Sequence, residues 1–426
     1  MGAPAGRDPF LAAGIFLYDS VMQVQCAIAG GGPAGMMLGY LLARAGVNVA
    51  VFEKHPDFLR DFRGDTIHPS TLEIMFELGI LDDLLKRPHQ EVRELSGEIG
   101  RTRVRIGDFA HVPTHCKFVA LMPQWDFLDF LAEQAKAFPT FTLMQEAAVV
   151  DLITDSDRIV GFTAQTNRGP IEVRASLTVG ADGRSSIVRE RGGLIVEDVG
   201  APIDVLWMRL SRKPSDPGQI FGHIEPGGIF VMFDRDEYWQ CALVIAKGGI
   251  DRVQARGLAA FRERISALEP VLRDRVDELR DWSDVKLLTV KIDRLRRWSR
   301  EGLLCIGDAA HAMSPIGGVG INLAIQDAVA AANLLAEPLR RDACSPSDLK
   351  KVQERREWPT KVTQWVQALI QKRVIFPTLG RTAPLSVPWP VKLLDRYAVL
   401  RRIPARFVGV GVRPEHVDLR PVRRQS

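Results

Sequence analysis

Apolar runs separated by glycine-rich turns predict strands that alternate with a helix near the start of the chain. Residues 24–29 (VQCAIA) predict a buried strand, and residues 34–46 (AGMMLGYLLARAG) predict a helix. Residues 48–53 (NVAVFE) predict a second buried strand. A strand, a helix and a second strand in this order are typical of a parallel sheet that helices cover.

Two later strand patterns of this kind also lead into glycine-containing turns. The first lies in SLTVGADGRSSIVRE (176–190), where Ser186 can cap the following helix. The second is LLCI (303–306), which precedes GDAAHAMSPIGGVGIN (307–322) and a long alanine-rich helix. Because glycine costs backbone entropy, so many glycines before a helix indicate that some group approaches this backbone closely.

The part of the chain between these two turns has a different pattern, which predicts an antiparallel sheet. Strands are expected at 200–212 and 238–249, with a hairpin at 218–236 between them. An amphipathic helix is expected over 253–276. The aromatic residues of this part are core residues by default, or else line a cavity: Trp207, Phe221, Phe230, Phe233, Tyr238 and Trp239.

Composition places the chain among ordinary globular proteins. Its 426 residues suffice for two or three cores, with 46% hydrophobic residues, 25% charged residues and a net charge of +4. This mild charge indicates no nucleic-acid partner. No apolar run reaches the roughly 18 residues of a transmembrane segment, and residues 1–21 are expected to lie outside the fold. Five scattered cysteines without a CxxC pair favour a reducing cytoplasm.

The turn after the first strand has the spacing Gly30-x-Gly32-x-x-Gly35, which is typical of dinucleotide binding. The first glycine would make a tight turn, the second would admit a pyrophosphate, and the third would let the helix pack on the sheet. The N–H groups at the start of the helix would bind the phosphates. Glu53 ends the second strand, where an acid is expected to bind ribose hydroxyls. This motif alone does not distinguish NAD from FAD.

The order of the three motifs is GxGxxG, then Asp182-Gly183, then Gly307-Asp308. It closely resembles that of the class A FAD-dependent aromatic hydroxylases, the p-hydroxybenzoate hydroxylase-type flavoprotein monooxygenases. The resemblance covers residues 22–336. It implies an α/β fold with a Rossmann-like FAD-binding domain, which is interrupted by an α+β substrate domain with an antiparallel sheet and followed by a C-terminal helical region.

The domain division expected for the chain is discontinuous. It comprises an FAD-binding domain of 22–92, 117–197 and 284–340, a substrate domain of 93–116 and 198–283, and a C-terminal helical region of 341–426. The C-terminal region could cover the flavin domain, form a dimer face or rest on a membrane surface, in that order of preference.

The resemblance also implies which residues contact FAD. Arg63 and Gln124 would touch its ribityl and pyrophosphate region, and Asp308 would hold ribityl hydroxyls or phosphate. Asp182 would lie where FAD and the nicotinamide nucleotide both pass. The full set of expected contacts is Gly30, Gly32, Pro33, Ala34, Gly35, Glu53, Lys54, Arg63, Gln124, Asp182, Gly183, Gly307, Asp308, Pro315, Gly317, Gly318, Val319, Gly320, Ile321 and Asn322.

For the chemistry, the resemblance implies tightly bound, non-covalent FAD, NADPH or NADH as a transient co-substrate, and O2. An oxygen atom would pass from a hydroperoxide at flavin C4a to a small aromatic or similarly electron-rich substrate. The helix that starts near Gly320 would direct its positive end at the reduced flavin. Pro315 would stiffen the loop over the ring, and a bulky side chain at Gly317, Gly318 or Gly320 would occupy space that the ring or substrate needs.

The expected catalytic residues are His68, Pro315 and Gly318. A base that activates a phenol is not determined, because His68, His223 and Tyr238 all remain candidates. His311 is expected to make a structural hydrogen bond in its loop.

No metal site is predicted, because Pro113 breaks any helical face that His111 and His115 could share with Cys116. A flavin-dependent halogenase is disfavoured, since its WxWxIP motif is absent. A dehydrogenase or reductase on the same fold, and a non-catalytic flavin- or ligand-binding protein, remain alternatives. A homodimer is left open.

Overall fold

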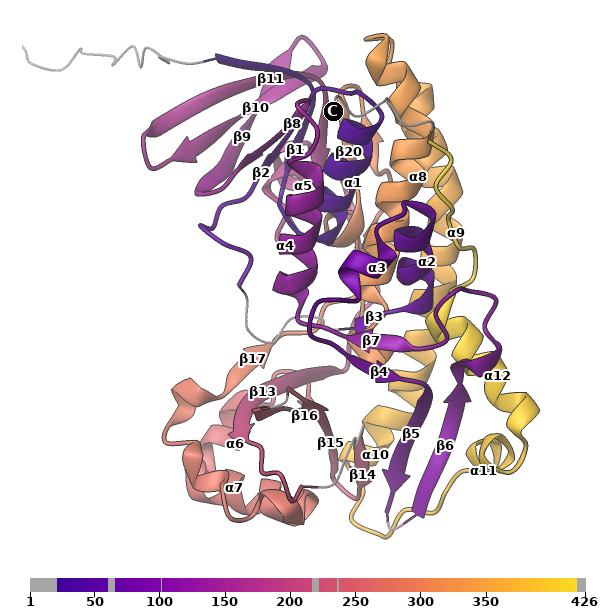
Figure 1. Cartoon of the computed structure of the whole chain (residues 1–426). Coiled ribbons are helices and arrows are strands. Elements are labelled where there is room, and N and C mark those ends of the chain that lie inside the picture. Colours follow the sequence, from indigo (N-terminus) through magenta and orange to yellow (C-terminus); the bar gives the residue numbers. More distant parts are fainter. Residues whose placement is uncertain (1–20, 60–65, 101, 217–221, 236, 420–426) are drawn as a thin grey trace, which may run out of the picture.

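The computed structural model describes residues 21–59, 66–100, 102–216, 222–235 and 237–419. Two large sheets dominate it, one at the top and one at the bottom of Figure 1, with C-terminal helices along the right side. This mixed α/β architecture with a C-terminal helical region confirms the expected fold class.

The upper sheet contains the first predicted strands. Its strands, in spatial order, are β19 (Ser299–Arg300), β20 (Leu303–Cys305), β11 (Gly169–Gly180), β1 (Val21–Ala29), β2 (Val49–Phe52) and β8 (Phe141–Met144). β1 pairs in parallel with β2 and β11, and β11 pairs in parallel with β20. An antiparallel arm of β9 (Ala147–Asp155) and β10 (Arg158–Thr166) extends from β11.

Helices cover this sheet. Parallel sheets are usually buried on both faces in this way, because the helices that connect their strands pack on them. α1 (Pro33–Arg44) packs against α8 (Gly320–Arg340) and α4 (Gln124–Ala135). Every residue of α1 from Ala34 to Ala43 is buried, which explains why the helix is apolar on all sides. Gly39 lets α1 approach the sheet, since a Cβ there would lie 2.6 Å from Val51.

Helix α8, counted over Ile316–Arg340, is long and apolar enough to cross a membrane by length and composition only. In the structure 72% of its most apolar window is buried. It packs against α1 on one side and α9 (Pro346–Ile370) on another. Its apolar composition is therefore explained by its place in the core.

The lower sheet is largely antiparallel. Its strands, in spatial order, are β17 (Lys286–Leu288), β13 (Ile203–Ser211), β16 (Tyr238–Ala246), β15 (Gly228–Asp234), β14 (His223–Glu225), β5 (Glu94–Ile99) and β6 (Thr102–Asp108). The strands expected at 200–212 and 238–249 are confirmed, and so is the hairpin between them over residues 223–234, while residues 218–221 and 236 lie outside the described part of the chain. The domain division stays a prediction, but the pairing of β17 with β13 places residues 286–288 in this sheet.

The helix expected over 253–276 is shorter and interrupted. Arg256 separates α6 (Ile250–Ala255) from α7 (Gly257–Leu268), and Gly257 at the start of α7 has φ +83. Pro270 begins a separate short turn after α7, which ends the longer pattern there. Phe261 and Ile265 of α7 pack with buried Trp239 in the core of the lower sheet.

A small sheet lies between the two large ones in Figure 1. Its strands are β3 (Thr66–Ile67), β7 (Val119–Leu121) and β4 (Gln90–Val92). A second small sheet consists of β12 (Val196–Asp198), β18 (Asp293–Leu295) and β21 (His311–Ala312). The other α-helices are α2 (Pro69–Glu77), α3 (Leu81–Leu84), α5 (Ile187–Arg191), α10 (Phe376–Leu379), α11 (Trp389–Arg396) and α12 (Ala398–Gly409).

Candidate active site

The carboxyl ends of four parallel strands meet at one edge of the upper sheet. Ala29 of β1 pairs with Phe52 of β2 and with Gly180 of β11, and Gly180 pairs with Cys305 of β20. Open α/β sheets bind ligands at this edge. The residues that follow these strands and are brought together here are Gly30, Gly32, Gly35, Glu53, Asp182, Gly183, Gly307 and Asp308.

The three glycines of the first turn differ in their surroundings. Gly30 has φ +104, and a Cβ there would lie 2.4 Å from the carbonyl oxygen of Ala181. A Cβ on Gly35 would lie 1.9 Å from the carbonyl oxygen of Gly30. Among the described residues, a Cβ on Gly32 would meet no atom within 4 Å, and Gly32 has an ordinary φ of −74. The packing of the protein therefore requires Gly30 and Gly35, whereas the described part of the chain leaves open space beside Gly32.

The N-terminus of α1 faces this turn with unsatisfied donors. No side chain of the described residues caps the helix, and Pro33 at its first position has no N–H group. Within the described part of the chain, the N–H groups of Ala34 and Gly35 have no acceptor. Such groups, together with the helix dipole, favour an anion at this position.

Glu53 lies directly after β2 and braces the first turn. Its Oε2 accepts a hydrogen bond from the N–H of Gly31 (3.0 Å), and its Oε1 accepts one from the N–H of His55 (3.2 Å). Lys54 is exposed beside it. Binding of ribose by Glu53 stays a prediction.

Asp308 and Arg184 connect the third motif with the second. The Nε of Arg184 donates to Oδ2 of Asp308 (3.1 Å), and both side chains are partly exposed. Gly183 has φ +83, and a Cβ there would meet nothing within 4 Å. The Oδ2 of Asp182 instead accepts the N–H of Val188 in α5 (3.2 Å), and burial raises the pKa of Asp182. Asp308 is thus the more accessible of the two expected acidic ligands.

A buried ionic network supports the third motif from behind. Oδ2 of Asp327 in α8 accepts the N–H of Gly307 (3.1 Å) and contacts Nε2 of His311 (2.6 Å). Its Oδ1 accepts Nε of Arg356 from α9 (3.0 Å). Burial opposes ionisation here, but His311 and Arg356 outweigh it and lower the pKa of Asp327. The structural hydrogen bond expected of His311 is confirmed.

A second support, which sequence reasoning missed, holds the loop that contains Pro315. Three glutamines on one face of α9 and its continuation, Gln364, Gln367 and Gln371, form what we call the glutamine ladder. Nε2 of Gln367 donates to the carbonyls of Ser314 (3.0 Å) and Ile316 (2.9 Å).

The other two members of the glutamine ladder bind the same loop on either side. Nε2 of Gln364 donates to the carbonyl of Ala312 (3.0 Å), and Nε2 of Gln371 donates to Oγ of Ser314 (2.6 Å). The spacing QxxQxxxQ in residues 364–371 was the available sequence signal. The ladder therefore fixes the backbone on both sides of Pro315.

The glycines after Pro315 differ in what a side chain would meet, and their expected closeness to the flavin stays a prediction. A Cβ on Gly318 (φ +63) would lie 2.3 Å from Oγ1 of Thr66, so the neighbour that excludes a side chain there is Thr66 of β3. A Cβ on Gly317 (φ +77) would be no closer than 3.7 Å to its neighbours, and one on Gly320 no closer than 3.9 Å. Gly320 is therefore the better position for testing the space in front of α8.

Asn322 and His68 connect α8 to α2. Oδ1 of Asn322 accepts the N–H of His68 (2.9 Å) and Oγ1 of Thr71 (2.7 Å). The His68 ring is buried, and its Nδ1 lies 2.7 Å from the carbonyl oxygen of Val408 in α12. Burial lowers the pKa of His68 to about 4, so the ring is neutral at physiological pH. A catalytic role for His68 stays a prediction.

The remaining expected residues lie as follows. Gln124 begins α4 and is half-buried, while Val319 and Ile321 are buried at the start of α8. Arg63 lies outside the described residues. His111 contacts Arg402, and the ring of His115 stacks on Phe76.

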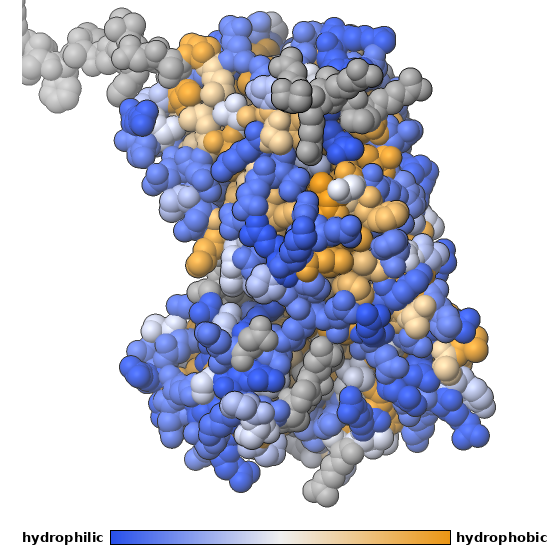
Figure 2. All heavy atoms as spheres, in the orientation of Figure 1, coloured by the Kyte–Doolittle hydropathy of each residue, from blue (hydrophilic) through white to orange (hydrophobic). Residues whose placement is uncertain are grey.

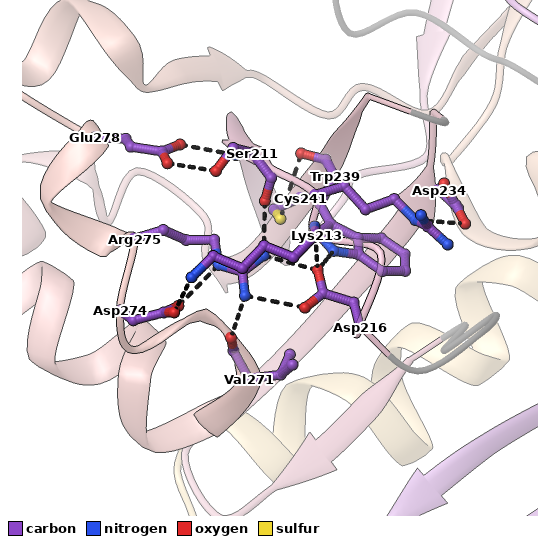
Figure 3. Close-up of polar contacts among 11 residues, drawn as sticks. Ser211, Lys213, Asp216, Asp234, Trp239, Cys241, Val271, Asp274, Arg275 and Glu278 are labelled. Atoms are coloured by element: carbon purple, nitrogen blue, oxygen red, sulfur yellow. Dashed lines mark hydrogen bonds and ion pairs between the residues drawn. The ribbon is translucent and has the colours of Figure 1, made fainter.

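The region of the lower sheet contains a buried ion pair, and its histidine His223 is poorly suited to act as a base. Figure 3 shows Asp216 accepting hydrogen bonds from Nη1 of Arg275 (2.7 Å) and Nε1 of Trp239 (2.8 Å), all buried. Glu269 raises the pKa of His223 to about 9, with a further contribution from Glu225. His223 is therefore protonated at neutral pH, which disfavours it as a base.

A family model described as "FAD binding domain" matches residues 23–366. The chain therefore belongs to the FAD-dependent aromatic hydroxylase family that the motifs resemble.

The relatives agree with this class. The chain is 35% identical over 385 residues to a 6-methylpretetramide 4-monooxygenase of Streptomyces rimosus, covering 88% of this chain and 91% of that protein. It is 26% identical over 322 residues to a dialkyldecalin synthase of Streptomyces rugosporus, covering 71% of this chain but only 63% of that longer protein. The p-nitrophenol 4-monooxygenase PnpA of Pseudomonas putida DLL-E4 shares the fold, with a TM-score of 0.75 at 20% identity, covering 91% and 98% of the two chains.

The residues of this chain fit FAD. The open space at Gly32 and the unsatisfied N–H groups of Ala34 and Gly35 suit a pyrophosphate. Asp308, half-exposed at the same edge, suits hydroxyl groups of the ribityl chain. A side chain at Gly32 would fill the cradle that the pyrophosphate needs.

Proposed function

We propose that this chain is a single-component monooxygenase that binds FAD, takes electrons from NADPH or NADH, and hydroxylates a small aromatic compound. The observation that carries the proposal is the open cradle at Gly32, at the edge where the three motifs of the family meet. When bound, FAD would supply the redox and oxygen chemistry, since protein side chains alone do not activate O2.

The contribution of the chain is placement and electrostatics. The N-terminus of α1 would hold the pyrophosphate, and Asp308 the ribityl chain. α8 runs for 21 residues without a capping side chain, so its positive end at Gly320 would favour negative charge in front of it. The glutamine ladder and Asp327 would keep the intervening loop in one conformation.

The substrate would lie between this loop and the lower sheet. In Figure 2 a notch at the left separates the upper and lower parts, and apolar side chains gather over the upper part. An aromatic substrate is supported by the names of the relatives.

The test is oxidation of NADPH and NADH across a panel of aromatic compounds, with product masses recorded. The panel contains 6-methylpretetramide, p-nitrophenol, phenols, salicylates and hydroxyquinolines. We expect at least one compound to stimulate oxidation of the nucleotide and to gain one oxygen atom. Nucleotide oxidation coupled to a product without added oxygen would instead support a dehydrogenase or reductase.

A second candidate is a flavin-binding protein that converts or holds its ligand without oxygenation. The similarity to a protein named dialkyldecalin synthase supports this second candidate. It predicts FAD binding and ligand binding with no stimulated oxidation of NADPH or NADH by any compound of the panel.

A further inference from the structure

The outward faces of α11 and α12 carry apolar side chains that nothing in the described chain covers. On α11, Trp389 is 73% exposed, and Leu393 follows it one turn later. On α12, Val399 is 66% and Ile403 is 69% exposed, again one turn apart. Tyr397, at the joint between the two helices, is half-exposed. We call these five side chains the apolar face; in Figure 2 apolar side chains also stand at the lower right, where Figure 1 shows α11 and α12.

Cations surround the apolar face. Lys392, Arg396, Arg402 and Arg406 lie on the same exposed sides of the two helices. The acid in these helices, Asp395, accepts the backbone N–H of Arg105 (3.0 Å) and pairs with its side chain on β6. The surface therefore combines aromatic and aliphatic side chains with unbalanced positive charge.

The basic character is local to this part of the chain. Residues 372–413 contain nine lysines and arginines and one aspartate, whereas the whole chain has a net charge of only +4. The remainder of the protein is therefore slightly acidic. A concentration of this kind at one surface points to an anionic partner.

The two helices are held so that this face stays outward. The opposite side of α12 is buried through Arg401, Ala405 and Gly409. A Cβ on Gly409 would lie 2.9 Å from the Phe109 ring, which shows how closely the inner side packs. The apolar residues thus cannot turn inward without breaking this contact.

We propose that the face formed by α11 and α12 binds peripherally to an anionic lipid bilayer. Helices that lie in the plane of a membrane interface have an apolar side with Trp or Leu flanked by Lys and Arg. Tryptophan and tyrosine favour the level of the lipid headgroups, and lysines and arginines there are attracted to anionic lipids. A second copy of this chain fits less well, because a symmetric contact would place the four cations opposite the same four cations.

The test measures binding of the full-length, FAD-loaded protein to sedimented vesicles. Vesicles of phosphatidylcholine alone are compared with vesicles that contain phosphatidylglycerol. We expect binding only to the anionic vesicles, and we expect salt to weaken it because the Debye length shortens. Lys392→Gln combined with Arg396→Gln should weaken binding by about fivefold per cation removed.

Two further variants separate the apolar contribution from unfolding. Trp389→Ser combined with Ile403→Ser should weaken binding by at least about tenfold, because two large apolar side chains no longer enter the interface. The matched controls are Val150→Ser with Ile195→Ser, two exposed apolar residues elsewhere, and Lys136→Gln with Arg168→Gln. The controls should bind as the unaltered protein does, and all variants should retain FAD absorbance.

The proposal is overturned if the protein does not bind anionic vesicles, or if the control variants reduce vesicle binding as much as the variants of α11 and α12 do. Light scattering that shows a dimer dissociated by Trp389→Ser, without vesicle binding, would assign the face to a second copy instead. Binding of an acidic protein in place of vesicles would also refute it. FAD absorbance is measured for every variant and shows whether the protein is folded. Vesicle binding can therefore be judged even if the protein proves not to be a monooxygenase.

Discussion

Replacing Gly32 by valine should greatly weaken FAD binding while leaving the fold intact. Gly32 has φ −74 and ψ −175, a conformation that valine adopts without strain, and a Cβ there meets no atom of the described residues within 4 Å. Loss of a glycine N-cap for a β-branched residue costs at most about 1 kcal/mol of helix stability. The structure therefore separates ligand loss from misfolding at this position.

The expected loss of affinity follows from the donors that Gly32 leaves accessible. The N–H groups of Ala34 and Gly35 would bind a charged phosphate, and each such bond contributes about 1.5–3 kcal/mol. Displacing the pyrophosphate by the valine side chain should remove both, about 3–6 kcal/mol in all, which is roughly 10²–10⁴-fold in Kd. Gly32→Ala, with one methyl group, should show a smaller loss.

The assay is titration of the apoprotein with FAD, followed by flavin fluorescence, together with thermal unfolding of each variant. Gly380→Val is the matched control, because Gly380 also has open surroundings and a negative φ but lies far along the chain from the motifs. Unchanged FAD affinity in Gly32→Val would refute the placement of the pyrophosphate. Gly35→Ala should instead destabilise the fold itself, because its Cβ would overlap the carbonyl oxygen of Gly30.

Three further predictions concern the supports of the site and the lower sheet. Gln367→Leu should lower the free energy of unfolding by about 1–3 kcal/mol, because backbone groups of the loop lose their hydrogen-bond partners. It should also weaken FAD binding, and unchanged FAD affinity would show that FAD binding does not depend on the glutamine ladder. Arg275→Met should lower the free energy of unfolding, measured with urea, by about 3–5 kcal/mol, because it leaves the buried Asp216 carboxylate without its cation. A change below about 1 kcal/mol would show that this ion pair does not stabilise the fold. The raised pKa of His223 stabilises the fold fully below about pH 6.5, and that contribution is lost as the pH rises through about 9. Unfolding free energies of His223→Gln and the unaltered protein should therefore converge at high pH, and a constant difference would refute the assignment.

The sequence predicted the elements whose cause is local. The strand, turn and helix around Gly30 to Gly35 follow from short-range apolar patterns and from a glycine spacing that one turn geometry explains. The same holds for Ser186, whose Oγ accepts the N–H of Arg189 as expected of a helix cap. In the structure, the motifs meet at one edge because they follow neighbouring parallel strands.

Contacts between distant segments were not predictable in this way. Gln367 binds a loop more than fifty residues earlier in the chain, and only the packing of α9 along α8 sets its register. A Cβ on Gly318 would meet Thr66, which no sequence pattern places beside it. Similarly, the inward position of His68 depends on α12, whose carbonyl at Val408 its ring contacts.

The proposed reaction transfers an oxygen atom from O2 to an aromatic substrate. It is tested by supplying dioxygen labelled with heavy oxygen, together with FAD-loaded protein, NADPH or NADH and the compound that stimulates nucleotide oxidation. We expect one labelled oxygen atom in the product and none when Gly32→Val replaces the unaltered protein. A converted product whose added oxygen comes from water, or one that contains no added oxygen, would refute oxygen transfer from O2.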